Sequence, residues 1–227
     1  MITILDYGMG NLRSVEKAFQ KIGAKVKVSN SPKDVKDASS IVLPGVGAFK
    51  DCMENLERLG LTTPIIEAIK QGKPYLGICL GMHILFEESS EFGIHKGLGI
   101  FKGNVPRFSK GEGDSEKGAL RGKCEGGLPP LRSKMSLLKV PHMGWNKVNL
   151  LNKTPLFEGI EDGQYFYFVH SYYVAPKDEQ IIAGTTQYGG TFTSMIHKDN
   201  IYAVQFHPEK SQKIGLKILE NFVKINL

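Results

Sequence analysis

Tyr75-Leu76-Gly77-Ile78-Cys79-Leu80-Gly81 is the stretch of sequence that decides the fold. Its apolar beginning predicts a buried strand over residues 75–78, and the run that follows predicts a helix over residues 82–88. The G-x-C-x-G pattern between them is typical of a nucleophile elbow, a sharp strand-to-helix turn. The glycines leave room where the two backbones approach, and the amides at the start of the helix favour a thiolate. The sequence therefore predicts a sheet that presents Cys79 at the end of a strand.

Strands and helices alternate on both sides of this stretch. Toward the N-terminus the expected strands are 2–6, 25–29 and 41–43, and the expected helices are 12–22, 50–59 and 64–71. After residue 139 strands are expected at 146–150, 164–173, 181–186, 192–197 and 201–206, followed by a helix over 212–225. The order predicts a single α/β domain over residues 1–227, built on one open, mixed, mostly parallel sheet flanked by helices. The second half is expected to extend that sheet in antiparallel fashion.

Composition excludes several classes of protein. The chain has 227 residues, 41% hydrophobic and 23% charged, which fits a globular domain and excludes a disordered one. No apolar run approaches the roughly 18 residues of a membrane helix, and the first residues lack the basic region of a secretory signal. Three cysteines without metal-like spacing argue against a disulfide framework. The expectation is a cytoplasmic protein that makes no contact with a membrane.

The net charge of +6 is concentrated in one segment. Residues 107–139 hold eight Lys or Arg, four Asp or Glu and six glycines, and therefore carry four of the six net charges. The segment shows no strand or helix period over its first two-thirds, so a basic, Gly-rich loop insertion is predicted. Its only aromatic residue is Phe108, whereas nucleic-acid binding sites interleave aromatic and basic residues. No nucleic-acid partner is expected, and deletion of residues 111–127 is expected to leave the domain folded.

A base for the thiol is available in Gln205-Phe206-His207-Pro208-Glu209, at the end of a predicted strand. Proline fixes an extended backbone, so His207 and Glu209 point the same way. Glu209 then accepts from one ring nitrogen of His207 and leaves the other nitrogen for Cys79. Taken separately, each motif has a structural alternative: a buried apolar cysteine, or a surface histidine beside a solvated glutamate. Together they favour a nucleophile, a base and an orienting carboxylate.

Other motifs are weaker. Gly8-Met9-Gly10 begins like a dinucleotide-binding fingerprint but lacks the third glycine, and no phosphate-binding P-loop occurs. Four histidines lack the spacing of a zinc site and are expected to be structural or to form polar walls of the cleft: His95, His142, His170 and His197. Cys52 and Cys124 have neither an elbow nor a base, so both are expected to be non-catalytic. Neither a cofactor nor a metal is predicted.

With these motifs in place, the sequence resembles the triad (class I) glutamine amidotransferases, whose catalytic order is Cys, His, Glu. The resemblance is closest to the glutaminase subunits of imidazole glycerol phosphate synthase and covers nearly the whole chain apart from residues 107–139. The motifs that carry it, besides the elbow, are Asp6 to Asn11, Pro44 to Gly47, Pro141 to Asn146, Tyr167 to Tyr172 and Gln205 to Ser211.

This resemblance implies a flavodoxin-like fold and a chemistry. Cys79 would attack L-glutamine with His207 and Glu209 as its partners, and the thioester would be hydrolysed to glutamate. The implied oxyanion hole uses the backbone of Leu80 and of the Val46-Gly47 loop. The implied glutamine pocket is lined by Gly47, His83, Glu91, Ser171 and Tyr172. The family usually has glutamine at position 83, so an altered substrate affinity is expected.

The resemblance also implies a partner. In that family the ammonia passes through a channel to a (βα)8-barrel cyclase, which forms a heterodimer with the glutaminase and makes imidazole glycerol phosphate and an aminoimidazole carboxamide ribotide in histidine biosynthesis. The implied interface residues are Asn11, Trp145, Tyr167 and Lys210, although a lone tryptophan is equally often a core residue. Two alternatives remain: a paralogous glutaminase that feeds another synthase, such as one that amidates surface sugars, and an inactive regulatory subunit.

Overall fold

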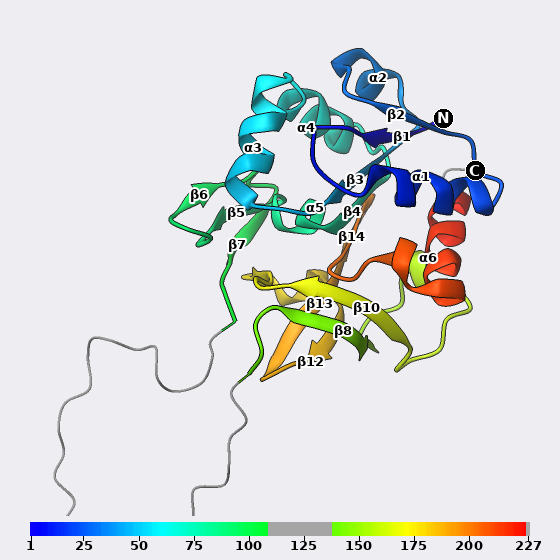
Figure 1. The fold of residues 1–227 in the computed structure, drawn as a ribbon. Helices are drawn as coiled ribbons and strands as arrows, with labels where there is room; N and C mark the ends of the chain where they lie inside the picture. Colours follow the sequence, from blue (N-terminus) through cyan, green and yellow to red (C-terminus); the bar gives the residue numbers. More distant parts are fainter. Residues whose placement is uncertain (109–137, 226–227) are drawn as a thin grey trace, which may run out of the picture.

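The computed structural model describes residues 1–108 and 138–225, and its centre is an eight-stranded mixed sheet (Figure 1). Five neighbouring strands run parallel, in the order β2 (Val26–Ser29), β1 (Ile2–Leu5), β3 (Ser40–Gly45), β4 (Tyr75–Cys79) and β14 (Ile201–Val204). Three antiparallel strands continue the sheet, namely β13 (Thr191–Lys198), β12 (Ile182–Gln187) and β9 (Asn149–Leu150). The predicted α/β class and its mostly parallel sheet are confirmed.

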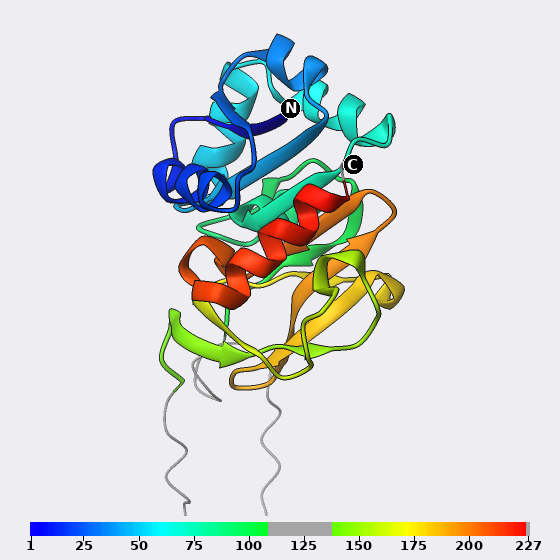
Figure 2. The same cartoon turned by 90° about the vertical axis from the view of Figure 1, so that its right-hand side faces the viewer.

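Helices cover both faces of this sheet, which explains why its central strands are apolar without alternation. Two apolar clusters lie on opposite faces, because successive residues of a strand point to opposite sides. One cluster includes side chains of α2 (Pro32–Asp37), α3 (Phe49–Arg58) and α4 (Thr62–Lys70). The other includes side chains of α1 (Leu12–Lys21) and α6 (Gln212–Lys224), which lie together in Figure 2. The core thus fixes the carboxyl ends of the parallel strands at one edge.

Strands β9, β12 and β13 form the antiparallel extension that was expected for the second half, and two smaller sheets lie outside it. Strands β8 (His142–Lys147) and β10 (Tyr165–His170) pair only with each other, as an antiparallel unit that we call the β8–β10 ribbon (Figure 1). The inward Phe166 and Phe168 join the cluster on the α1–α6 side, which places the ribbon across the sheet rather than along its edge. The other sheet contains β11 (Ala175–Pro176), β7 (Phe101–Val105), β5 (Phe86–Ser89) and β6 (His95–Lys96).

Local elements differ from the sequence prediction in several places, and the short strands β5, β6 and β11 were not predicted. The helix expected over residues 82–88 is wrong, because α5 (Leu80–His83) ends early and the next strand begins at Phe86. Ile84, Leu85 and Phe86 are all fully buried, and three successive residues do not fit the single apolar face of a surface helix. Helix α2 was not predicted. The strand expected at 146–150 is divided between β8 and β9, and most of the predicted 107–139 insertion lies outside the described residues.

Short 3-10 turns complete the described chain: η1 (Pro155–Phe157), η2 (Glu179–Ile181) and η3 (Pro208–Lys210). Within residues 1–108 and 138–225, no helix has the length and apolarity to cross a membrane. The same residues contain no group of three or more His, Cys, Asp or Glu side chains that is able to hold a metal ion.

Candidate active site

Cys79 lies on the tight turn between β4 and α5. Its φ of 53° and ψ of −105° are strained for a residue with a side chain. A Cβ atom on Gly81 would overlap the carbonyl oxygen of Leu43, and one on Gly77 would overlap that of Gly81. Both obstacles are backbone atoms, so only glycine fits at the two positions. This local packing holds the Cys79 side chain at the carboxyl end of the parallel sheet.

His207 and Glu209 follow β14, the strand beside β4. The Nδ1 atom of His207 lies 2.9 Å from Oε1 of Glu209, and both side chains are only 2% exposed. Burial lowers the pKa of His207, but the interactions with Cys79 and Glu209 outweigh it and raise that pKa to about 10. The Nε2 atom of His207 is buried without a hydrogen-bond partner among the described residues. The imidazole is thus oriented by Glu209 and retains one free nitrogen.

Gln205 is a further residue of this site that the sequence analysis did not single out. It is fully buried, and its Nε2 atom donates to Sγ of Cys79 at 3.5 Å. Its Oε1 atom lies 2.7 Å from Nε2 of His83. The signal in the sequence was its spacing, because every second residue of an extended segment points the same way and Gln205 precedes His207 by two.

A cavity of about 260 Å3 opens beside Cys79. The residues proposed from the sequence for the oxyanion hole and the glutamine pocket all line it: Val46, Gly47, Leu80, His83, Glu91, Ser171 and Tyr172. Pro141, Val169 and His170 complete its wall. The carboxylate of Glu91 accepts from the backbone N–H of Phe49 at 2.7 Å, at the start of α3, and burial raises its pKa. The cavity therefore combines a nucleophile, one carboxylate and the start of α5.

A directed chain of hydrogen bonds supports the wall of this cavity. Nδ1 of His170 donates to the carbonyl oxygen of Tyr172 at 2.8 Å, so Nε2 of the neutral ring accepts from Nδ1 of His142 at 2.9 Å. Nε2 of His142 then accepts from the amide of Asn146 at 3.1 Å. Burial lowers the pKa of His142 to about 4 and also lowers that of His170, which keeps both rings neutral. The chain ties the ribbon to the loop that carries Ser171 and Tyr172.

The predicted interface residues lie outside the cavity. Trp145 is 45% exposed and its ring centroid is 6.1 Å from that of Tyr167, its cross-strand neighbour on the outer face of the β8–β10 ribbon. The Lys210 ammonium lies over the Tyr167 ring, 5.7 Å from the centroid. Asn11 is the N-cap residue of α1, which packs against η3, although its side chain makes no capping hydrogen bond. Trp145 is therefore not a core residue.

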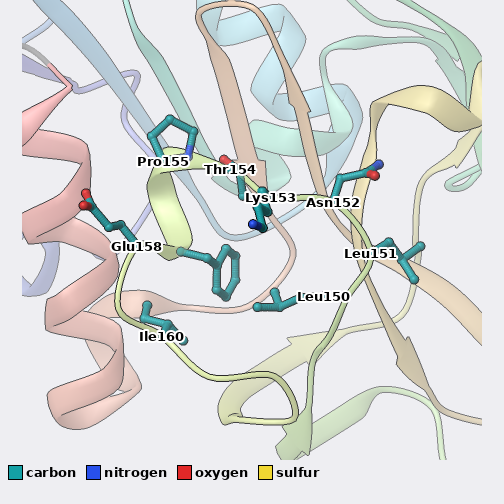
Figure 3. A pocket seen from close by; sticks show the side chains of 9 residues that line it. Leu150, Leu151, Asn152, Lys153, Thr154, Pro155, Glu158 and Ile160 are labelled. Atoms are coloured by element: carbon teal, nitrogen blue, oxygen red, sulfur yellow. The ribbon is translucent and has the colours of Figure 1, made fainter.

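Two other features do not belong to the site. A larger, mostly apolar cavity of about 640 Å3 lies along the segment between β9 and η1, and none of the nine residues that line it is a candidate site residue (Figure 3). Burial raises the pKa of the Cys52 thiol to about 12, which makes it unreactive at neutral pH. Cys124 lies outside the described residues.

Together, the strained cysteine, the carboxylate-oriented imidazole and the cavity suit acyl transfer through a covalent intermediate. With the fold, they define a class-I glutamine amidotransferase. The chain belongs to that family, because the model of the family "Glutamine amidotransferase class-I" matches residues 3–225. Two solved structures share the fold: a glutamine amidotransferase (TM-score 0.69, 14% identity, covering 99% of this chain and 98% of that one) and PurLQS from Thermotoga maritima (TM-score 0.70, 18% identity, 99% and 97%).

Curated relatives define the branch of the family. The chain is 51% identical to "Imidazole glycerol phosphate synthase subunit HisH" of Geobacter sulfurreducens, with 97% of both chains covered. It is 48% identical to the protein of that name from Syntrophotalea carbinolica, with 98% of both covered, and 49% identical to that of Methanocaldococcus jannaschii, with 99% of this chain and 100% of the other covered. The chain is thus a member of the HisH family.

Proposed function

We propose that this protein hydrolyses L-glutamine to glutamate and ammonia through a thioester on Cys79, and that it supplies the ammonia to the cyclase subunit of imidazole glycerol phosphate synthase in histidine biosynthesis. The observation that carries the chemistry is the buried pair of His207 and Glu209 behind a strained Cys79 that opens into the cavity. The HisH relatives support the pathway. The expected location is the cytoplasm.

In the first half-reaction, Sγ of Cys79 attacks the side-chain amide carbon of glutamine. The amide oxygen becomes an oxyanion, which accepts hydrogen bonds from the backbone N–H of Leu80 and from the Val46-Gly47 loop. His207 gives its Nε2 proton to the amide nitrogen, the C–N bond breaks, and ammonia leaves. Glu209 stabilises the imidazolium through Nδ1 and is itself unchanged.

In the second half-reaction, a water molecule attacks the thioester carbon. The now neutral His207 accepts a proton from this water through Nε2, and the same donors hold the oxyanion. The C–S bond breaks, glutamate forms and Cys79 returns as a thiolate beside the imidazolium. In this scheme the Glu91 carboxylate accepts from the α-ammonium group of glutamine, while Ser171, Tyr172 and His83 confine the rest of the substrate.

The partner in this proposal is a (βα)8-barrel cyclase that forms a heterodimer with this chain. It sits on the outer face of the β8–β10 ribbon, where Met143, Trp145 and Tyr165 are 62%, 45% and 51% exposed. Exposed aromatic residues in a cluster are typical interface anchors. Pro141 and Val169 at the ribbon ends line the cavity, so ammonia released there is close to the proposed partner surface. Asn11 and Lys210 form the edge of this surface.

Glutamate release is the measurement that tests the proposal. The chain is mixed with a barrel cyclase and its nucleotide ligand, and wild type is compared with Cys79→Ala and, as a matched thiol control, Cys124→Ser. We expect the cyclase to stimulate release from wild type and from the control, and Cys79→Ala to abolish it. Activity that survives in Cys79→Ala contradicts the mechanism, and the absence of stimulation by any cyclase contradicts the partner.

A further inference from the structure

The side chain of Gln205 connects His83 to the nucleophile. Its amide nitrogen lies 3.5 Å from Sγ of Cys79, and its amide oxygen lies 2.7 Å from Nε2 of His83. Gln205 is fully buried and His83 is 6% exposed, so both interactions are largely shielded from bulk solvent. The backbone of Gln205 is fixed as well, because its N–H donates to the carbonyl oxygen of Ser194 at 2.9 Å.

A hydrogen-bond donor at this place acts on one form of the cysteine more than on the other. A neutral thiol is a weak acceptor, whereas a thiolate accepts a charge-assisted hydrogen bond that is about twice as strong as a neutral one. The N–H group of Gln205 therefore favours the thiolate. His207 contributes the positive charge and Gln205 contributes a neutral donor, so the sulfur anion has two different stabilising neighbours.

The stabilisation of the Cys79 thiolate depends on which end of the Gln205 amide faces the sulfur. Rotating the amide by 180° would place a carbonyl oxygen against the thiolate and turn attraction into repulsion. Burial lowers the pKa of His83 to about 4, opposed by the contact with Gln205, so the ring is neutral and carries one proton. Oε1 of Gln205 can only accept, so in this arrangement Nε2 of His83 carries the ring proton and donates to it. His83 thereby selects the orientation that points the N–H group at Cys79.

We propose that Gln205 stabilises the Cys79 thiolate directly, and that His83 is a positioning residue that holds the Gln205 amide in the required orientation. This inference rests on the proposed function in one respect, because it assigns Cys79 as the nucleophile. It gives His83 a role in addition to the substrate contact expected from the sequence. A glutamine at position 83 also has an N–H group to donate to Gln205, which explains how either residue serves there.

The test is the pH dependence of Cys79 alkylation by iodoacetamide, followed on the Cys79 peptide by mass spectrometry and without glutamine. Gln205→Met keeps the side-chain volume and removes the donor, and Gln205→Glu keeps the shape and replaces the donor with an acceptor. Gln180→Met, on an exposed residue of η2, is the matched control. The titratable groups that interact with Cys79, namely His207 and Tyr7, are unchanged in all variants.

We expect the alkylation midpoint to rise by about one to two pH units in Gln205→Met and further in Gln205→Glu, and to stay in place in the control. His83→Leu should raise the midpoint as well, and His83→Gln should restore it. Unchanged midpoints in the folded Gln205 variants overturn the inference, and equal midpoints in His83→Leu and His83→Gln overturn the role of His83. Wild type that alkylates as expected but never hydrolyses glutamine overturns the proposed function alone.

Discussion

Glu209→Gln isolates the contribution of one buried charge to the site. The two side chains are isosteric, and the amide oxygen of the replacement still accepts from Nδ1 of His207. The wild-type N···O distance is 2.9 Å and both groups are 2% exposed. At an effective dielectric constant of about 20, unit charges at that distance attract each other by about 6 kcal/mol before desolvation. Removing one member of such a buried pair costs about 3 kcal/mol or more.

A loss of about 3 kcal/mol lowers the pKa of His207 by about two units, from about 10 to about 8. The same loss reduces kcat for glutamate release about 100-fold, because the imidazolium that protonates the leaving ammonia is less stable. Stability changes in a defined direction. The wild-type pKa lies above the unfolded value of about 6.5, so protonated His207 stabilises the fold fully below that pH and loses this contribution as the pH rises through about 10.

The assay measures cyclase-stimulated glutamate release between pH 6 and 11, together with the free energy of urea unfolding over the same range. We expect the alkaline limb of kcat/KM to move downward by about two pH units, and the stability deficit of the variant to be largest near pH 6 and to vanish above about pH 10. Glu161→Gln, on an exposed residue, is the control. An alkaline limb that does not move, with kcat within about threefold of wild type, refutes the charge argument.

Three further changes test other parts of the structure. Gly81→Ala forces a Cβ onto the carbonyl oxygen of Leu43 and should lower the free energy of unfolding by about 3 kcal/mol. Gly190→Ala is the control, because open space surrounds this position and the free energy of unfolding should change little. Equal urea midpoints for the two variants would contradict the argument. Trp145→Ala should change the free energy of unfolding of the free chain by less than about 1 kcal/mol, because the side chain is exposed. It should weaken binding to the cyclase, measured by calorimetry, by about 2 kcal/mol. An unchanged affinity would show that Trp145 does not contribute to the interface. His170→Phe removes the donor to the Tyr172 carbonyl and should reduce kcat/KM for glutamine about tenfold; wild-type kinetics would show that the hydrogen-bond chain does not hold the pocket wall.

The parallel half of the fold is readable from the sequence because its signals are local. A short apolar run defines each of β1, β3 and β4, with glycine or proline beside the runs of β3 and β4, and amphipathic spacing defines α1 and α3. Gly77 and Gly81 mark the elbow for a physical reason, since backbone atoms occupy the space of any side chain there.

The second half is harder to derive because strand partners are chosen by tertiary contacts. Nothing in the alternation of residues 142–147 or 165–170 says that they pair with each other and leave the main sheet. The Ile84-Leu85-Phe86 run is equally apolar in a helix or a strand, and only packing from several sides decides against a helix. Within the site, Gln205 has the spacing of His207 and Glu209 but no distinctive chemistry, so its role depends on the position of Cys79 in space.

The β8–β10 ribbon has a consequence for how the chain tolerates changes of length. Residues of one strand alternate between its two faces, so the buried His142 and the outward Trp145 are separated by an odd number of positions. Deleting or inserting a single residue within β8 would exchange the faces, turning the tryptophan inward and the histidine toward solvent. Natural and engineered variants of this segment are therefore expected to differ in residue type but not in residue number.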